Sequence, residues 1–460
     1  MKAKYILLVI ALASVFGACR REEKDLFDDS AAVRAQKALD NARDVLTAPA
    51  NGWEMLYFPN PESGGYSVLI KFDAKGNVFV ASRNPQTTAN KYMTDGNSTW
   101  VVVSDYGPIL SFDTYNNVMH KWADPDPNPN SRNTDYERGD GYLGDYEFLI
   151  LEATPEKVRL KGKKHGAYCI LYPLKVGLDW IEYFNQVYVY RDLLVTGNDG
   201  TAFKYLTPGS EKKVVYNAGR MDEDYERGLI YPFVIRPNLV TFYNTGMPAQ
   251  GGNAINFKIN SEMTALECVD NGISARFESA MTIAEILNAK LDNHIQWTID
   301  KKDMGESSKA AYDVIANALK SSGGSLRKIT IQRIDSTYQD PEAEGEPEVV
   351  TKIDRINIEF NGSNGLTQAF FVMDFTLNGT QLSYSYKYPS GEDKNPMYAS
   401  EFLQRAGGGV GKEDVGLERL KALITGEFNV ASASGSTLNA KQLYLTGTND
   451  SNKRIKISAQ

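Results

Sequence analysis

Hydrophobic and polar residues alternate with a period of two along most of the chain, as in strands that bury one face. Gly-bearing turns separate many of these segments, and short turns favour antiparallel neighbours. The segments expected to form strands before residue 300 are 53–58, 66–72, 77–82, 99–104, 109–115, 117–122, 146–152, 157–161, 167–173, 230–235, 239–243, 254–259 and 265–269. Those expected beyond residue 300 are 328–334, 350–360, 368–377, 380–388, 427–431, 441–445 and 454–458. This pattern predicts a mainly β (α+β) fold of antiparallel sheets or barrel-like domains.

A few short amphipathic helices interrupt the strands, because hydrophobic residues there recur every three to four positions. The segments expected to be helical are 35–46, 281–291, 311–319 and 417–424. Segment 179–194 fits a helix, but its valines and tyrosines also fit a strand, and both interpretations stay open. The main boundary is expected near residue 300, with an N-terminal antiparallel β domain at 29–300 and a C-terminal β-rich domain at 301–460.

The N-terminus has the pattern of a secretory signal peptide, which we expect to span residues 1–18. Two lysines precede an apolar run at 5–16 that is too short to cross a bilayer of about 30 Å as a helix. Gly17-Ala18-Cys19 then resembles a bacterial lipobox, although Phe16 replaces the usual leucine. The sequence therefore predicts cleavage before Cys19 and anchoring of its lipidated form in the bilayer; the alternative is an ordinary signal peptide with a chance cysteine.

A charged tether is expected at residues 19–28, directly after the lipidation site. Its Arg-Arg-Glu-Glu-Lys-Asp stretch is similar to the surface-export signal of Bacteroidetes-type lipoproteins. This similarity implies a location in the outer membrane, at the cell surface. A solvated tether on the periplasmic side remains the alternative.

Charge and composition exclude several classes of protein. The chain has 50 Lys and Arg against 58 Asp and Glu, which gives a net charge of −8 and argues against nucleic acid as a partner. It has 26 Tyr but only 3 His and 3 Cys, so it is rich in residues that pack strands or stack on ligands. We expect no cofactor. Cys169 and Cys268 lie in apolar runs, where a cysteine is usually a small buried hydrophobic residue rather than half of a disulfide.

The sequence contains no complete motif for catalysis or metal binding. The three histidines, His120, His165 and His294, are too far apart for the usual zinc spacing. His120 is expected on a strand, as a half-exposed residue rather than a general base. The acidic and amide residues of 124–135 have a calcium-loop spacing, but Pro129 replaces the required glycine. The Gly-rich segment 406–413 lacks the key residues of a phosphate loop and is expected to join two helices.

A ligand site is expected on the Pro-rich loop 123–143, because loops between rigid strands carry recognition. Asp124 and Asp126 would hydrogen-bond sugar hydroxyls. The rings of Trp122, Tyr136 and Tyr142 would stack on a sugar, which requires Trp122 to be partly exposed. The competing interpretation is a mobile linker with Trp122 wholly buried in the core.

Several phrases of the sequence together resemble one family. They lie at 52–59, 65–73, 105–116, 144–148 and 160–164. In this order they resemble an uncharacterised family of Bacteroidetes lipoproteins, known only as a domain of unknown function, over roughly residues 30–300. Members of that family tend to accompany SusC/SusD-type uptake complexes, so the resemblance implies capture of a glycan or peptide ligand. It implies no catalytic residues.

These observations predict an outer-membrane, surface-exposed lipoprotein that serves as a binding accessory of a nutrient uptake system, and not an enzyme. Two alternatives stay open. The first is a carboxylate-dependent hydrolase of glycans, since no acidic pair stands out among the 58 acids. The second is a structural or adhesin component.

Overall fold

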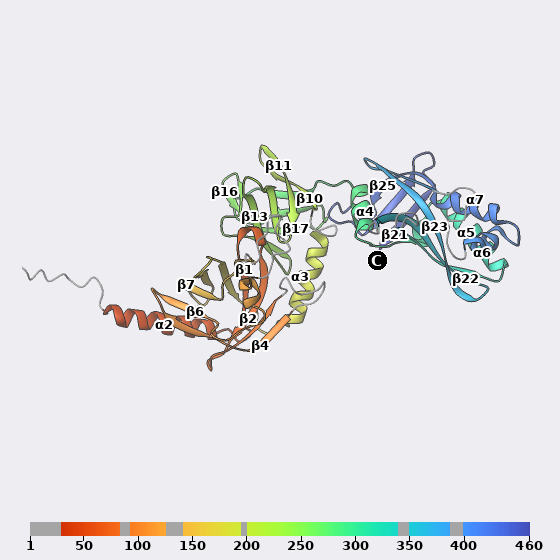
Figure 1. Cartoon of the computed structure of the whole chain (residues 1–460). Coiled ribbons are helices and arrows are strands. Elements are labelled where there is room, and N and C mark those ends of the chain that lie inside the picture. Colours follow the sequence, from red (N-terminus) through yellow and green to blue (C-terminus); the bar gives the residue numbers. More distant parts are fainter. Residues whose placement is uncertain (1–28, 83–92, 126–140, 195–199, 339–348, 387–398) are drawn as a thin grey trace, which may run out of the picture.

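The computed structural model describes residues 29–82, 93–125, 141–194, 200–338, 349–386 and 399–460. Figure 1 shows an elongated arrangement of three β assemblies, with α2 (Ala31–Thr47) at one end and a barrel with three helices at the other. The fold is mainly β, with antiparallel and barrel-like sheets and a few short helices, which confirms the predicted fold class. The site residues Cys19, Asp126 and Tyr136 lie outside the described residues.

The first assembly is a sheet of nine described strands in the order β4-β3-β2-β1-β9-β8-β7-β6-β5. Several strands coincide with the predicted segments, because a short turn and strict alternation fix both ends of each strand. The bounds are β1 (Trp53–Phe58), β2 (Tyr66–Phe72), β3 (Asn77–Ser82), β4 (Met93–Thr99), β5 (Val101–Ser104), β6 (Pro108–Ser111), β7 (Glu147–Ala153), β8 (Val158–Gly162) and β9 (Tyr168–Pro173).

The turn between β2 and β3 shows how the local sequence defines a hairpin. Asp73 Oδ1 accepts hydrogen bonds from the backbone N–H groups of Lys75 and Asn77, both at 2.8 Å. Gly76 has a φ of +91°, a backbone conformation that would be strained in a residue with a side chain. Local residues therefore define this turn, and Trp100 supports it through hydrogen bonds from its backbone N–H to Gly76 O at 2.9 Å and from Nε1 to Asp73 O at 3.2 Å.

The two edge strands of the sheet, β4 and β5, are consecutive in the chain. The segment 113–117 binds the edge of β4, so that side chains replace part of the missing backbone ladder. Thr99 N donates to Thr114 Oγ1 at 2.7 Å, and Asn116 Nδ2 donates to Ser98 Oγ at 2.6 Å. This edge is therefore covered by the protein's own chain, which limits pairing with other strands.

One expected strand of this region is wrong. Segment 117–122 does not extend; instead His120–Ala123 form the short 3-10 helix η2, so His120 does not lie on a strand. The cause is Asn116, whose Oδ1 accepts from the N–H groups of Val118 and Met119 and so starts a helical turn.

Two helices cover the sheet. α2 buries Ala42, Val45 and Leu46 against its inner face. The undecided segment is a helix, α3 (Trp180–Leu194), which places Tyr183 and Phe184 on the other face. The buried spacing of three to four along α3 thus outweighs the strand preference of its valines and tyrosines.

The second assembly is a closed antiparallel barrel in which β10 pairs with β19. Its strands are β10 (Ala202–Thr207), β11 (Ser210–Asn217), β12 (Arg220–Asp224), β13 (Leu229–Arg236), β14 (Leu239–Phe242), β17 (Asn256–Ile259), β18 (Ala265–Cys268) and β19 (Arg276–Ser279). A two-stranded ribbon, β15 (Met247–Ala249) and β16 (Gly252–Ala254), connects β14 to β17 and buries Met247 and Ala254 in the core of this barrel. Phenylalanine rings fill the interior: Phe203, Phe233, Phe242, Phe257 and Phe277.

The first barrel is joined to the sheet by a buried ion pair. Arg236 of β13 donates from Nε to Glu54 Oε1 of β1 at 2.8 Å, and from Nη2 to Glu54 Oε2 at 2.5 Å. Tyr183 of α3 donates to the same carboxylate at 2.6 Å. Because three elements share this network, the sheet, helix and barrel are held in one arrangement.

The third assembly is a second closed antiparallel barrel, in which β20 pairs with β27. Its strands are β20 (Trp297–Asp300), β21 (Ser325–Tyr338), β22 (Val349–Gly362), β23 (Gly365–Asn378), β24 (Gln381–Tyr386), β25 (Gly426–Ser432), β26 (Gln442–Gly447) and β27 (Arg454–Ala459). The nine-stranded sheet and the first barrel both lie within 29–300, and β20 at the end of that range belongs to this second barrel.

Helices cover both ends of the second barrel. α4 (Ile283–Asp292) lies at the end nearer the first barrel, and α5 (Glu306–Ser321), α6 (Ala399–Gly407) and α7 (Glu413–Ile424) lie at the far end in Figure 1. All four helices contribute apolar side chains to the barrel core. The Gly-rich segment joins α6 to α7, as the sequence predicted.

A loop of the second barrel completes the core of the first. The loop 433–441, between β25 and β26, places Leu438 among the apolar residues of the first barrel, where it is only 2 % exposed. Ser436 Oγ donates to Met263 O at 2.8 Å and Thr437 Oγ1 donates to Thr264 O at 3.2 Å. We call this loop the inter-barrel latch.

Candidate functional site

The ring that was expected to stack on a ligand is buried. Trp122 has no exposed surface and packs against Tyr57 and Tyr66, with ring centroids 4.8 Å and 5.4 Å apart. Tyr142 is only 2 % exposed. The expected partial exposure of Trp122 is therefore wrong, because η2 turns its indole into the sheet core instead of presenting it on a strand.

The acidic residue next to Trp122 is engaged by a neighbour. Asp124 Oδ2 accepts from Lys121 Nζ at 3.0 Å. With two of the three expected rings inside the core, the described part of loop 123–143 does not form the stacking surface that the sequence suggested.

Three aromatic side chains lie in a row beside this loop, on the protein surface. His120 is the central ring: its centroid is 4.4 Å from that of Tyr146, with nearly parallel planes at 18°. On its other side the Tyr115 ring is 4.7 Å away, tilted by 35°. Tyr115 is 62 % exposed and Tyr146 is 41 % exposed. We call Tyr115, His120 and Tyr146 the aromatic row.

Hydrogen bonds of the loop before η2 and of the start of β7 hold the row. Asn116 N–H donates to His120 Nδ1 at 3.0 Å, and His120 N–H donates back to Asn116 O at 3.0 Å. Tyr146 precedes β7, and its carbonyl accepts from Phe112 N–H at 3.2 Å. His120 thus belongs to η2, Tyr146 directly precedes β7, and Tyr115 lies in the loop next to Asn116.

Burial favours the neutral form of the central ring. Burial lowers the pKa of His120 below its ordinary value, and the N–H of Asn116 requires an unprotonated Nδ1. The neutral ring then carries its proton on Nε2, which has no hydrogen-bond partner among the described residues. Next to the row, Lys163 Nζ lies 2.9 Å from Asp105 and 3.6 Å from Glu147, so its charge is balanced by acids.

The aromatic row combines residues that the sequence could not bring together. Tyr115 and Tyr146 both belong to phrases that carry the family resemblance, at 105–116 and 144–148. Membership of these two phrases was the sequence feature that could have pointed to Tyr115 and Tyr146. Their proximity depends on the pairing of β6 with β7, which the alternating pattern alone does not specify.

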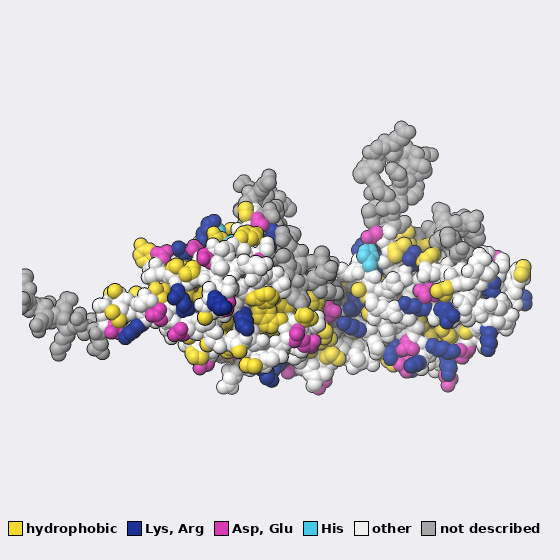
Figure 2. All heavy atoms as spheres, turned by 90° about the horizontal axis from the view of Figure 1, so that it is seen from below, with side chains coloured by type: hydrophobic (Ala, Val, Ile, Leu, Met, Phe, Trp, Pro, Cys, Tyr) yellow, Lys and Arg dark blue, Asp and Glu magenta, His cyan; other side chains and the backbone are white. Residues whose placement is uncertain are grey.

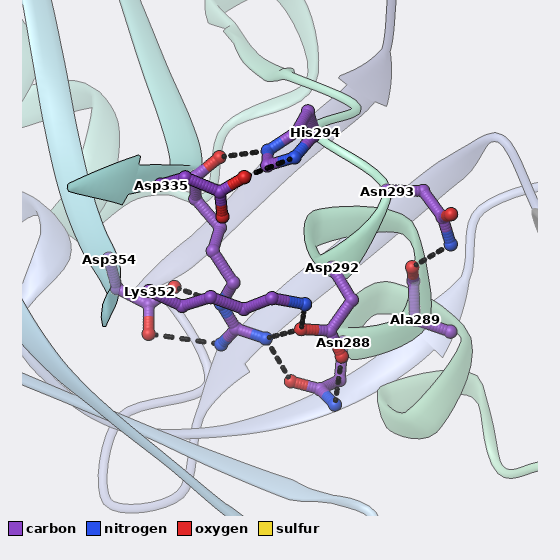
Figure 3. Close-up of polar contacts among 9 residues, drawn as sticks. Asn288, Ala289, Asp292, Asn293, His294, Asp335, Lys352 and Asp354 are labelled. Atoms are coloured by element: carbon purple, nitrogen blue, oxygen red, sulfur yellow. Dashed lines mark hydrogen bonds and ion pairs between the residues drawn. The ribbon is translucent and has the colours of Figure 1, made fainter. Parts of the chain in front are cut away.

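A second polar cluster lies at the α4 end of the second barrel (Figure 3). Arg333 of β21 donates from Nε and Nη2 to both oxygens of Asp354, at 2.9 and 3.0 Å. Its Nη1 donates to Asn288 and Asp292 of α4, both at 2.9 Å, and Lys352 also donates to Asp292 at 3.0 Å. We call these residues the Arg333 cluster.

The Arg333 cluster docks α4 onto the barrel rather than poising an acid for catalysis. Burial would raise the pKa of Asp292, but hydrogen bonds from Lys352 and Arg333 outweigh it and hold that pKa below its ordinary value. A general acid needs a raised pKa, so the lowered pKa of Asp292 favours a structural role for its carboxylate. His294, whose φ is +60°, ends the helix and approaches Arg333 O with Nδ1 at 3.1 Å.

The described residues offer no metal site: within them, no group of three His, Cys, Asp or Glu side chains converges. Cys169 and Cys268 are free cysteines; Cys169 is buried, as expected, and Cys268 is half-buried. In the part of the chain that the structure covers, no helix is long and apolar enough to span a bilayer. On the face shown in Figure 2, basic and acidic side chains are interspersed, unlike the continuous basic surface of nucleic-acid-binding proteins.

Comparison with known proteins gives one match. The search of curated proteins returns no similar protein, and the search of solved structures returns no similar fold. Residues 23–260 match the family described as Domain of unknown function (DUF4302). This match spans the nine-stranded sheet, with its aromatic row, and most of the first barrel. Because it covers a little more than half of the chain, the protein belongs to the DUF4302 family.

Proposed function

We propose that this protein is a lipoprotein of the outer membrane, displayed at the cell surface, that binds ligand for a nutrient uptake system. Lipidated Cys19 holds it in the bilayer, and the charged residues that follow act as a tether and export signal. Its expected partners are the bilayer, an uptake complex of the SusC/SusD type, and a glycan or peptide ligand. Nucleic acid is not a partner.

The observation that carries this proposal is the shape of the molecule relative to its anchor. Ala31, where α2 begins, is only 12 positions after Cys19 in the chain. In Figure 1, α2 lies at one end of the elongated arrangement and the second barrel lies at the other. A body anchored near α2 can project its β assemblies away from the membrane, which is what a receptor or accessory at a surface needs.

Its test combines location with uptake. We expect a protease added to intact cells to remove the wild-type protein, and a deletion strain to grow more slowly on at least one polymeric carbon or nitrogen source. Complementation with the wild-type gene should restore growth. Full protection from the protease, together with unchanged growth on all polymers tested, would overturn the proposal.

The Arg333 cluster gives little support to the hydrolase alternative, because its carboxylates Asp292 and Asp354 both accept hydrogen bonds from Arg333. Incubation of the purified protein with the same polymers distinguishes the two functions. Release of new reducing ends or amines would favour a hydrolase, whereas binding without release favours an accessory. A deletion strain with normal growth but defective surface assembly would favour a structural role.

A further inference from the structure

We propose that the aromatic row is a glycan-binding surface and that its ligand is an uncharged chain of hexoses. This inference rests on the proposed binding function and names its contact residues and ligand class. The row is distinct from the site expected at Trp122, whose ring lies inside the core.

The exposure of the row suits stacking on sugars. The rings of Tyr115 and Tyr146 both lie against His120, and the two tyrosines remain 62 % and 41 % exposed. The face of an aromatic ring is electron-rich, and it attracts the polarised C–H groups on the flat side of a pyranose.

The row is also ordered before any ligand binds. The backbone N–H of Asn116 donates to His120, and its C=O accepts from His120. Its side-chain Nδ2 donates to Ser98, and its Oδ1 accepts from two successive backbone N–H groups. Binding therefore pays little entropy for ordering the central ring or the loop beside it. The Nε2–H of His120 adds one donor that a sugar hydroxyl can accept.

Charge around the row favours a neutral ligand. Glu147 directly follows Tyr146, and Asp113 is two positions before Tyr115. Lys163 pairs with Glu147 and with Asp105 in the turn between β5 and β6. An anionic glycan would meet more negative than positive charge there, while a neutral sugar would not.

The sheet edge argues for a glycan over a peptide. Extended peptides are usually captured by adding a strand to an exposed edge. Next to the row, the edge of β4 is covered by the side chains of 113–117, including Thr114 and Asn116. The surface thus offers ring faces and hydroxyl partners, not a free backbone ladder.

The experiment measures binding of maltoheptaose, cellohexaose and mannohexaose by titration calorimetry, with a tryptic digest of casein as the peptide probe. We expect at least one oligosaccharide to bind the wild-type protein, and Tyr115→Ala or Tyr146→Ala to weaken its Kd by about tenfold or more. Tyr115→Phe keeps the ring and should retain most of the affinity.

The matched control is Tyr106→Ala. Tyr106 is fully exposed at the turn between β5 and β6, whereas Tyr146 lies against the other end of β6. This variant should bind as the wild type does, and circular dichroism should show all variants folded.

Two outcomes would overturn the inference: no oligosaccharide binds at up to about 10 mM, or binding is unchanged in both tyrosine variants. Binding of the casein peptides alone, weakened by the same variants, would replace the glycan with a peptide. If growth on polymers depends on the protein but the tyrosine variants support it fully, the proposed function stands and only this site fails.

Discussion

Lys290 of α4 is a buried base that forms no ion pair with a carboxylate among the described residues. Its side chain is only 7 % exposed. Burial, with the nearby Lys441, lowers its pKa to about 8, and Asp192 only partly offsets this. A lysine whose pKa is lower in the folded state than in the unfolded state reduces the free energy of unfolding at every pH at which it is charged.

We expect Lys290→Met to raise the free energy of unfolding at pH 7 by about 1–3 kcal/mol. The unfolded lysine has an ordinary pKa near 10.4, so between pH 8 and that value the unfolded state binds more protons. Wild-type stability rises with pH in that window, and the advantage of the variant should shrink there. Urea denaturation across this pH range measures the difference.

The control is Lys309→Met, which removes an exposed lysine from α5. It should change stability by less than about 0.5 kcal/mol at every pH. If Lys290→Met is less stable than the wild type at pH 7, or if its advantage does not depend on pH, the assigned cost of Lys290 is wrong.

Arg333 is a different case, because its charge is paired. Removing it by Arg333→Met leaves Asp354, whose side chain is 14 % exposed, without its bidentate partner. We expect a loss of about 3 kcal/mol, in the range found when one half of a buried pair is deleted. Urea denaturation of the full chain gives the value.

The double variant Arg333→Met, Asp354→Leu tests the cause. Since it removes both charges, it should recover most of the lost stability. A double variant as unstable as the single one would show that the arginine stabilises the barrel by packing, for example over the Phe375 ring at 5.3 Å, and not by ion pairing.

At the scale of elements, local signals predicted most hairpins correctly. Strands 53–58, 66–72 and 77–82 have the predicted bounds, because alternation and turn chemistry act within a few residues. The error at 117–122 arose where alternation continued but Asn116 started a helical turn. The sequence did not distinguish a helix from a strand at 179–194, because the burial of this segment against the sheet and the first barrel depends on contacts distant in sequence.

The inter-barrel latch is an element whose importance is tertiary. Leu438→Asp would place a charge in the core of the first barrel, against residues contributed by that barrel and by α3. We expect faster hydrogen exchange in β17 and β18, next to the latch, while β21–β23 keep their protection. Exchange measured by mass spectrometry resolves these segments.

Val410→Asp is the matched control, because Val410 lies in the loop between α6 and α7 and is 93 % exposed. Exchange in β17 and β18 should not change in this variant. If Leu438→Asp also leaves these strands protected, the two barrels do not depend on each other for stability.

At the scale of the whole molecule, anchoring rests on one residue. We expect Cys19→Ala to release the protein from membranes, because the lipid on that cysteine is the anchor we propose. Fractionation followed by a high-salt wash checks this. A variant that still sediments with membranes would mean that something other than the lipid holds the protein.

The sequence by itself determined the class of the fold, many strand and turn positions, and the expectation of an anchor at Cys19. It did so because periodicity, turn residues and the N-terminal pattern are local properties, readable within a few turns of chain. It also supplied the family resemblance that includes Tyr115 and Tyr146, without showing that the two rings meet.

Only the tertiary structure decided which surfaces exist. The closure of the two barrels, the burial of Trp122 and the insertion of Leu438 into another barrel all depend on contacts between distant segments. The same is true of the aromatic row, which needs the loop at 113–117, the turn η2 and the start of β7 to converge. Alternation tells which face of a strand is buried, but the partner that buries it is chosen by packing of the whole chain.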